Sequence, residues 1–419
     1  MSATASVRDR LASVRPRGRL SPWWILVGLG GVMLLLALLQ LVTGANDLAS
    51  SGTLRATLIA SVPIALAGLG GLWSERAGVV NIGLEGMMIL GTYGAGFFGY
   101  HYGAWAGVLG AAALGAVGGL IHAVATVTFG VDHIISGVAI NIIAVGATQY
   151  LAVQTFTGLP GGGQTQSPKL DDVGSISIGP LSEALGQVEQ RDIFFVSEVA
   201  AFLRALVTDL SLLTVLAVVL FVITYFLLWR TAFGLRLRSC GESPVAAETL
   251  GVNVYRYKFV AVITSGALAG LAGGFLTLVA SSNYRDGQTG GRGYIGLAAM
   301  IFGNWRPSGL LMGSGLFGYT ETLGLRQGGD SVHALLLAIT LLLLAVAVWQ
   351  VRNAQRGAAG VSVVLAAGIA ALYFSIDTVP RDFTQMTPYV TTLLVLAMAS
   401  QRLRMPAADG LRYRRGEAG

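Results

Sequence analysis

The sequence predicts an all-α membrane protein with many spanning helices, and three properties support this prediction. Hydrophobic residues make up 54% of the 419 residues, whereas charged residues make up only 11%. A soluble chain of this length carries more charge on its surface. Apolar stretches long enough to cross a bilayer recur along the chain, and basic residues gather in alternate loops between them. Because backbone in lipid must satisfy its own hydrogen bonds, these spans are expected to be helices.

The predicted spans follow from the length of each apolar stretch, because about 20 residues cross the hydrocarbon core as a helix. One shorter apolar piece, at 294–304, lies in a region that is otherwise polar and rich in glycine. The predicted spans are 22–42, 54–73, 82–100, 104–129, 134–156, 211–229, 258–282, 307–325, 332–349, 359–375 and 387–400.

The basic residues indicate the orientation, because Lys and Arg collect in cytoplasmic loops. Alternating the loops between the two sides places Arg230, Arg236, Arg238 and most of the 27 basic residues on one side. Both termini then fall on that side, and we expect them to be cytoplasmic. This bias and contact with anionic membrane lipid account for the net charge of +6, so no nucleic-acid partner is expected.

The chain lacks the patterns that catalytic, metal or nucleotide sites require. Its single cysteine, Cys240, and its four scattered histidines have no ligand spacing, so no metal site is expected. A phosphate-binding loop needs a lysine after its glycines, and neither Lys169 nor Lys258 follows such a loop. HExxH and GxSxG patterns are also missing, which argues against an intramembrane enzyme. We therefore expect no catalytic residues and no cofactor bound by this chain itself.

A polar segment, SCGESPVAAETLGVNVYRY at 239–257, interrupts the apolar sequence. Ser243 followed by Pro244 is typical of a helix start, and we expect the Ser243 hydroxyl to cap free N–H groups. Gly251 stands where a left-handed residue would end the helix. A short helix between two spans has no core of its own, so we expect it to dock against a partner outside this chain.

Glycines at helical spacing predict closely packed helices. Gly266, Gly270 and Gly274 lie four residues apart, as do Gly115 and Gly119. Small residues at this spacing let helix backbones approach in a membrane, where apolar burial does not drive association.

The chain also contains a faint internal repeat. The segment from Ile82 to Gly91 resembles the segment from Ile295 to Gly303, and each follows a polar break that contains glycine. Paired segments of this kind are typical of duplicated transporter folds, in which the substrate route runs between the halves. Chance similarity between helices rich in Gly, Ile and Leu is the alternative.

Three stretches carry a resemblance to a known family: GLWSERAGVVNIGLEGMMILGTYGA, GESPVAAETLGVNVYRYKFVAVITSGALAGLAGGF and GRGYIGLAAMIFGNWRPSGLLMGSGLFG. They look like permease subunits of bacterial ABC importers in the branched-chain amino acid and ribose permease family, and most closely like its nucleoside branch. The resemblance implies a type II-like importer transmembrane domain with two pseudo-repeats, placed in the bacterial inner membrane. Extra spans are then expected at both ends of the chain.

This resemblance divides the chain into three parts. Residues 1–53 are expected to form a basic cytoplasmic tail and a first span, and 351–419 to form additional spans and a second basic tail. The permease core is expected at 54–350, with an extracytoplasmic loop at 157–208 that holds a helix near 193–207. A cytoplasmic coupling loop is expected at 230–257.

The resemblance also implies partners. ATP and Mg would be bound by a partner ATPase, in whose groove the short cytoplasmic helix sits. A second permease subunit and an extracytoplasmic substrate-binding lipoprotein, which the loop at 157–208 would receive, complete the expected complex. The residues expected to couple to the ATPase are Gly241, Ser243, Pro244, Ala246, Ala247 and Gly251.

Polar and aromatic residues within the spans are the candidates for a substrate pathway. Glu85 and Glu321 lie inside predicted spans, where an ionisable group needs a polar cavity or a partner. Asn81, Asn141 and Gln149 can pair with ribose hydroxyls or base edges, and Tyr93, Phe97 and Phe98 can stack on a base. Hydrogen bonds between helices and ordinary core packing are the alternative roles for these residues.

The resulting functional prediction is import of nucleosides, with purine nucleosides as the expected substrates. Simple sugars and branched-chain amino acids are alternative substrates for the same kind of permease. A secondary transporter driven by an ion gradient is a further alternative, but it would leave the helix at 243–251 without a partner.

Overall fold

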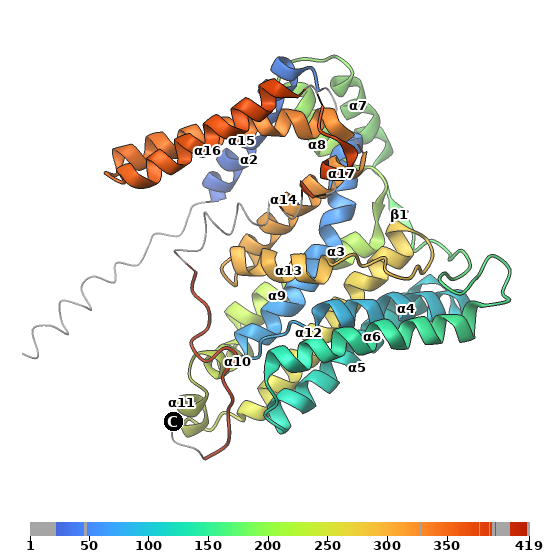
Figure 1. Ribbon diagram of the computed structural model, residues 1–419. Coiled ribbons are helices and arrows are strands. Elements are labelled where there is room, and N and C mark those ends of the chain that lie inside the picture. The colour runs from blue at the N-terminus through green and yellow to red at the C-terminus, as the bar shows by residue number, and fades with distance from the viewer. Residues whose placement is uncertain are drawn as a thin grey trace, which may run out of the picture.

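The computed structural model describes residues 22–45, 48–326, 328–376, 378–384, 386–387, 390 and 403–416. Within these residues the fold is helical apart from one two-residue strand pair (Figure 1). The first basic tail and most of the predicted span at 387–400 lie outside the described residues. The elements are α2 (Pro22–Thr43), α3 (Ser51–Arg76), α4 (Leu84–Tyr102), α5 (Ala104–Ala123), η1 (Val124–Thr128), α6 (His133–Phe156), β1 (Ser175–Ile176), α7 (Gly179–Glu189), α8 (Val196–Val207), β2 (Leu210–Ser211), α9 (Leu212–Arg230), α10 (Ala232–Glu242), α11 (Pro244–Thr249), α12 (Val254–Phe275), η2 (Leu276–Ala280), α13 (Arg292–Phe302), α14 (Pro307–Arg326), α15 (Gly328–Arg352), α16 (Arg356–Ser375) and α17 (Arg381–Thr384).

The predicted spans coincide in position with helices to within a few residues, apart from the one outside the described residues; α2, α4 and α14, at the predicted spans 22–42, 82–100 and 307–325, are not among the described helices that meet the length and hydropathy of a spanning helix. Seven helices of the described chain are long and apolar enough to cross a membrane: α3, α5 with η1, α6, α9, α12 with η2, α15 and α16. The protein is therefore an all-α, multi-pass membrane protein.

Short polar residues set where several helices begin. The Asp132 carboxylate accepts hydrogen bonds from the N–H groups of Ile134 and Ile135, at 2.9 and 3.1 Å, and so caps α6. Asn253 caps α12 by accepting from Arg256 N at 3.1 Å. These caps satisfy N–H groups that the first turn leaves free. Asn253 thereby separates the short α11 from the long α12.

The core has a crossed arrangement of two similar halves. In the centre, α3 and α12 pack against each other. Helices α4 and α5, which follow α3 in the chain, pack mainly on α12, whereas α13 and α14, which follow α12, pack on α3. Each half therefore uses the central helix of the other, and the sequence repeat found in α4 and α13 falls at matching positions. This exchange is what an internal duplication predicts.

Glycine permits close backbone contact between α5 and α12. A Cβ atom added to Gly266 would lie 2.3 Å from the carbonyl oxygen of Gly115, and one added to Gly270 would lie 2.2 Å from that of Ala111. Both distances are shorter than a van der Waals contact, so the two backbones touch only because these positions lack side chains. The predicted packing role of these glycines is confirmed.

One end of the helix bundle, here called the loop end, holds residues 157–208. Strands β1 and β2 pair there in antiparallel fashion, and α7 packs against α8. The predicted helix near 193–207 is confirmed as α8, whereas α7 was not predicted. An ion pair of 3.0 Å between Arg55 and Asp209 joins this segment to the start of α3.

The opposite end, here called the α11 end, holds α10, α11 and the C-terminal residues 403–416 (Figure 1). Helix α3 runs between the two ends and places Arg55 at the loop end and Arg76 at the α11 end.

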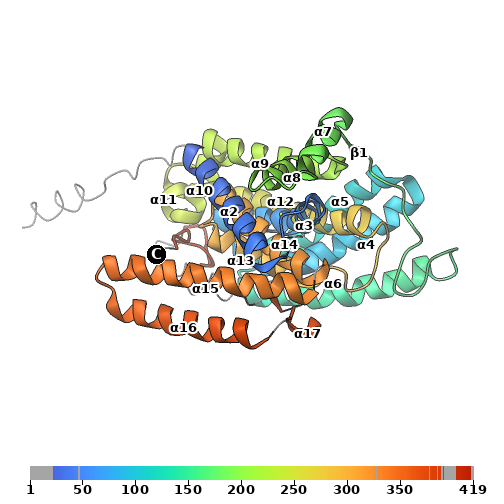
Figure 2. The ribbon, with the colours of Figure 1, turned by 90° about the horizontal axis from the view of Figure 1, so that it is seen from above.

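Helices from the two ends of the chain pack together at the edge of the core. Helix α2 contacts α15, with Leu36 and Leu39 of α2 in one buried cluster with Leu323 and Ala334. Helix α16 packs along α15 and lies outermost, side by side with it in both views (Figures 1 and 2). Exposed apolar side chains on α16, such as Val364 at 71%, suit contact with lipid.

Candidate functional site

The starts of α4 and α13, one from each half, meet at the Glu85 carboxylate. Glu85 lies in the first turn of α4, and its two oxygens accept hydrogen bonds from Gly291 N at 2.9 Å and Gly293 N at 2.7 Å. A carboxylate suits this place because the free N–H groups and the helix dipole make a helix start positive. Position 293 has to be glycine, because a Cβ atom added there would lie 2.6 Å from Glu85 Cα.

Asn141 of α6 holds the start of α4 in the same place. Its side-chain oxygen accepts from Gly86 N at 2.7 Å, and its amide nitrogen donates to the Ile82 carbonyl at 3.1 Å and to the Tyr294 hydroxyl at 2.8 Å. We call Glu85, Asn141, Tyr294 and the two helix starts the helix-start junction. Its side chains already have partners, so in this conformation they join three helices.

Asn81 lies beside this junction, in the break between α3 and α4. Its amide nitrogen donates to Ser265 Oγ of α12 at 2.9 Å, but its buried side-chain oxygen has no hydrogen-bond partner. A buried acceptor without a partner is unfavourable for folding alone. Asn81 therefore has an unused polar group beside the junction, as do Arg292 and Glu321 at the start of α13 and in α14.

The aromatic candidates form a separate group nearer the loop end. The Tyr93 ring lies 6.0 Å from that of Phe97, 5.9 Å from Phe156 and 6.1 Å from Tyr284, between ring centroids. Tyr93 follows Glu85 by about 12 Å along the helix, at 1.5 Å per residue. Phe98 packs edge-on against Phe97 at 5.2 Å. Only part of Phe97 is buried.

Gln149 lies apart from both groups. Its amide nitrogen donates to Asp286 Oδ2 at 2.9 Å on the exposed surface, joining α6 to the segment before α13. Among the predicted pathway residues, Glu85 and Asn141 both hold the start of α4, and Tyr93, Phe97 and Phe98 contact one another through their rings.

Arg292 and Tyr294 were missed as site residues, and both lie in the first turn of α13. Arg292 forms an ion pair with Glu321 of α14, so the charge predicted to need a partner has one. The sequence feature that could have identified Arg292 is its position just before the apolar piece at 294–304. Tyr294 had no such signal, because its role depends on Asn141, which lies 153 positions away.

Two blocks of the sequence resemblance meet at the α11 end. The Trp305 indole donates to Glu75 Oε2 at 2.6 Å, and Arg76 donates to the Trp305 carbonyl at 3.0 and 2.6 Å. These contacts attach the end of α3 to the turn between α13 and α14.

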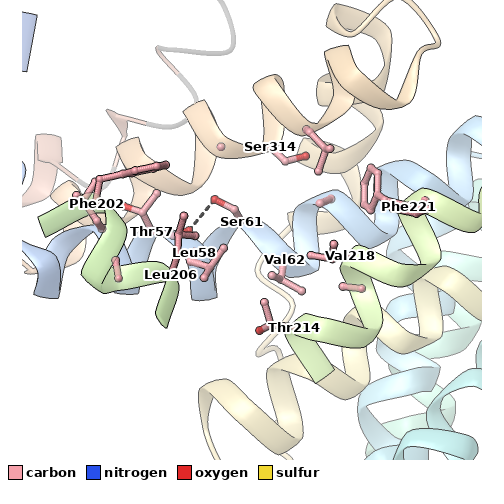
Figure 3. Close-up of a pocket in the computed structure, with 17 residues that line it drawn as sticks. Thr57, Leu58, Ser61, Val62, Phe202, Leu206, Thr214, Val218, Phe221 and Ser314 are labelled. Atoms are coloured by element: carbon pink, nitrogen blue, oxygen red, sulfur yellow. Dashed lines mark hydrogen bonds between the residues drawn. The ribbon is translucent and has the colours of Figure 1, made fainter. Parts of the chain in front are cut away.

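Two cavities lie away from these groups. One, of about 330 Å³, lies among α3, α8, α9 and α14 and is almost entirely apolar, with the hydroxyls of Thr57, Ser61 and Ser314 in its wall (Figure 3). The other, of about 250 Å³, is polar and lies at the loop end beside Arg55 and Asp209. Neither cavity is lined by a predicted pathway residue.

The predicted short helix is confirmed as α11, and its end has the expected geometry. Gly251 has φ of +81°, its N–H donates to the Glu248 carbonyl at 2.8 Å, and the Val252 N–H donates to the Ala247 carbonyl at 3.0 Å. This pair of bonds is a Schellman motif, which needs a left-handed residue at the glycine.

The predicted Ser243 cap is wrong in one respect, because the Ser243 side chain makes no cap hydrogen bond. Ser243 is shared by two helices, and its backbone serves both: its N–H donates to the Ser239 carbonyl at 2.9 Å and its carbonyl accepts from Ala247 N at 3.0 Å. Pro244 occupies the first position of α11, as predicted.

The coupling candidates divide between two faces of this helix pair. Gly241 and Ala247 are buried: Gly241 lies against the Arg76 carbonyl, and Ala247 packs in a cluster with Cys240 and Val254. The outward face presents Ala246 and Leu250, and Leu250 is 83% exposed. A partner would therefore contact Ala246 and Leu250, while Gly241 and Ala247 fix α11 to its own chain.

The crossed helical core and its buried helix starts define a membrane permease. Residues 53–348 match the family described as branched-chain amino acid transport system / permease component, and the chain belongs to this family.

Two curated relatives cover most of the chain. The guanosine ABC transporter permease protein NupQ of Bacillus subtilis is 32% identical over 86% of this chain and 96% of its own length. The nucleoside ABC transporter permease protein NupC of Lactococcus lactis is 33% identical over 85% of this chain and 94% of its own. A putative glucose ABC transporter permease, TsgC13 of Haloferax volcanii, is 35% identical over 66% of this chain and 78% of its own. No solved structure matches the chain significantly.

Proposed function

We propose that this chain is the membrane permease subunit of an ABC importer that carries purine nucleosides. The observation that supports this most strongly is the similarity, over about nine tenths of their own length or more, to permeases named for guanosine and nucleosides. Membership of the permease family argues against the ion-driven secondary transporter. The substrate route runs between the two crossed halves, past Asn81 and the helix-start junction.

The chemistry of the predicted route suits a nucleoside, which is polar and aromatic at once. Asn81 has an unused amide oxygen near the centre, and Tyr93 and Phe97 present rings farther along α4. A free sugar needs polar groups without rings. Glucose remains the second candidate, because one relative is named as a putative glucose permease.

In the proposed complex, ATP and Mg bind to a partner ATPase, and the exposed face of α11 sits on that ATPase. The α11 end and both termini face the cytoplasm, since that end carries the larger share of basic residues. A second permease subunit packs against the lipid-exposed faces, and a substrate-binding lipoprotein docks on residues 157–208.

Competition for uptake tests the substrate. The complex is reconstituted in proteoliposomes and takes up labelled guanosine in the presence of unlabelled guanosine, ribose, glucose or leucine. Purine nucleosides should compete strongly and the other compounds weakly. Equal competition by glucose or ribose would assign the permease to sugars instead.

An Asn81→Leu variant tests the route in the same assay. Loss of one neutral hydrogen bond to substrate is worth about 0.5–1.5 kcal/mol, so uptake efficiency should fall about two- to tenfold while the complex still assembles. Full activity in this variant would remove Asn81 from the route.

A further inference from the structure

The C-terminal residues 403–416, here called the strap, are bound to the α11 end at several points. Arg404 N donates to Asn304 Oδ1, in the turn between α13 and α14, at 2.8 Å. Ala408 N donates to the Gly241 carbonyl of α10 at 2.8 Å. In Figure 1 this dark red segment descends beside α10 towards α11.

Asp409 inserts from the strap into the core. It is only 6% exposed, and the charged groups that face it are Glu75 and Arg76 of α3 and Lys258 of α12. Its carboxyl group interacts with the Glu75 carboxyl group and with the Gly410 backbone, and burial raises the pKa of Asp409 to about 7. An acidic group buried in this way weakens the attachment of the strap whenever it is ionised.

The end of the strap covers α11. Arg415 Nε lies 3.3 Å from Glu248 Oε1 of α11, and the Tyr413 ring lies 5.5 Å from that of Tyr255. Tyr413 also packs against the buried cluster that contains Cys240 and Ala247. The strap is thus in contact with α10, α11, α12 and the turn that leads to α14.

We propose that the strap is the link that fastens α11 to both halves of the permease, and that its release uncouples α11 from the core. The role in coupling rests on the proposed function, because it assumes that an ATPase acts on α11.

The need for such a link follows from the size of α11. A helix of six residues with one buried side chain, Ala247, has little stability of its own and few contacts through which to transmit movement. The strap adds contacts to Glu248 on one side and to the ends of α3 and α12 on the other. Because α3 and α12 belong to different halves, movement of α11 reaches both.

Cys240 reports on the strap directly. It is the only cysteine of the chain, it is fully buried, and burial raises its pKa to about 11. A thiol in this state reacts slowly with maleimide, so labelling of Cys240 measures opening of the cover that includes Tyr413.

The test compares the same substitution at adjacent residues in the assembled complex. Ala408 is buried and Ala407 is exposed. Ala408→Arg cannot be accommodated and should displace the strap, whereas Ala407→Arg adds the same charge and should leave the strap in place. A chain that ends at Arg402 removes the strap altogether and does not depend on one substitution. Labelling of the Cys240 peptide is followed by mass spectrometry.

Labelling should be about tenfold faster or more in Ala408→Arg and in the shortened chain than in the wild type and Ala407→Arg. The two strap variants should also hydrolyse more ATP for each nucleoside imported.

Equal labelling rates in all four proteins would show that the strap does not cover α11. Faster labelling with an unchanged ratio of transport to hydrolysis would show that the strap binds there without coupling. A wild-type complex that imports no nucleoside would overturn the proposed function instead, and labelling would still decide whether the strap is attached.

Discussion

At the scale of single residues, Glu85 joins the two halves of the core. It belongs to α4 in one half and satisfies two backbone N–H groups at the start of α13 in the other. A single carboxylate thus joins the two copies of the internal repeat at the place where the substrate route is proposed.

Replacement of Glu85 by Gln should destabilise the protein. The amide has one accepting oxygen where the carboxylate has two, so one N–H of α13 loses its acceptor and faces an NH₂ group. Loss of a charged hydrogen bond costs about 1.5–3 kcal/mol, which thermal unfolding in detergent should detect. Glu183→Gln, on an exposed side chain of α7, is the matched control and should unfold like the wild type. An unaltered unfolding temperature in Glu85→Gln would mean that the carboxylate does not stabilise the helix-start junction.

Asp409 predicts a dependence of strap attachment on pH. Burial raises its pKa from an ordinary 3.8 to about 7, so the attached state holds the proton more tightly than the free strap. Attachment is therefore strongest at pH values below the ordinary pKa and weakens as the pH rises to about 7. Above that pH, the contribution of protonated Asp409 to attachment is completely lost. The titratable groups that face Asp409 are Glu75, Arg76 and Lys258. Glu242 of α10 lies at the edge of this site, where it accepts a hydrogen bond from Ala407 N.

The measurement is the ratio of Cys240 labelling in the wild type to that in Asp409→Asn, which cancels the pH dependence of the thiol itself. Between pH 6 and 8 this ratio should rise and then level off. A ratio that stays constant across this range would show that Asp409 does not titrate in the strap.

At the scale of elements, glycine brings the backbones of α5 and α12 into close contact. Addition of a methyl group tests it. Gly266→Ala places Cβ against the Gly115 carbonyl and should destabilise the protein or prevent its assembly. Gly146→Ala, in α6, meets nothing within 4 Å and should be tolerated. The yield of folded protein and its unfolding temperature check both variants; equal behaviour would contradict the close approach.

The exposed face of α11 is the other element with a specific prediction. Leu250→Asp places a charge on the proposed contact with the ATPase, so stimulated ATP hydrolysis should fall about tenfold or more while membrane insertion is unchanged. Leu235→Asp, on an exposed leucine of α10, is the control. Stimulation that survives in Leu250→Asp would place the ATPase contact elsewhere.

Most of the helices were predictable from the sequence, and the reasons differ between elements. The long spans follow from apolar length, and α11 follows from Pro244 and Gly251, because both signals are local. Helix α7 has one such signal, Pro180 in its first turn, but it lies in a region whose composition is typical of a loop and packs on α8. The outward or inward direction of Ala246 and Ala247 was not predictable, since it depends on what packs beneath the helix.

The site was predicted less completely for the same reason. Glu85 and Asn141 were found as polar groups within spans, but their partners, Gly291 and Tyr294, come from distant parts of the chain. The attachment of residues 403–416 gave no signal, because a basic tail next to a membrane is usually explained by lipid.

At the scale of the whole molecule, two similar halves exchange their outer helices around the central pair α3 and α12. The helix-start junction lies where the halves meet, and α11 with the strap lies at the end where an ATPase is proposed to act. This arrangement accounts for how movement at one end can change access to the proposed route between the halves.

The most direct test of this account is the initial rate of guanosine uptake into proteoliposomes that contain the complete complex, with and without ATP on the side of α11. We expect uptake that requires ATP, and that is lost in Leu250→Asp but retained in Leu235→Asp. Uptake at the same rate without ATP, or ATP-driven uptake of glucose with none of guanosine, would contradict it.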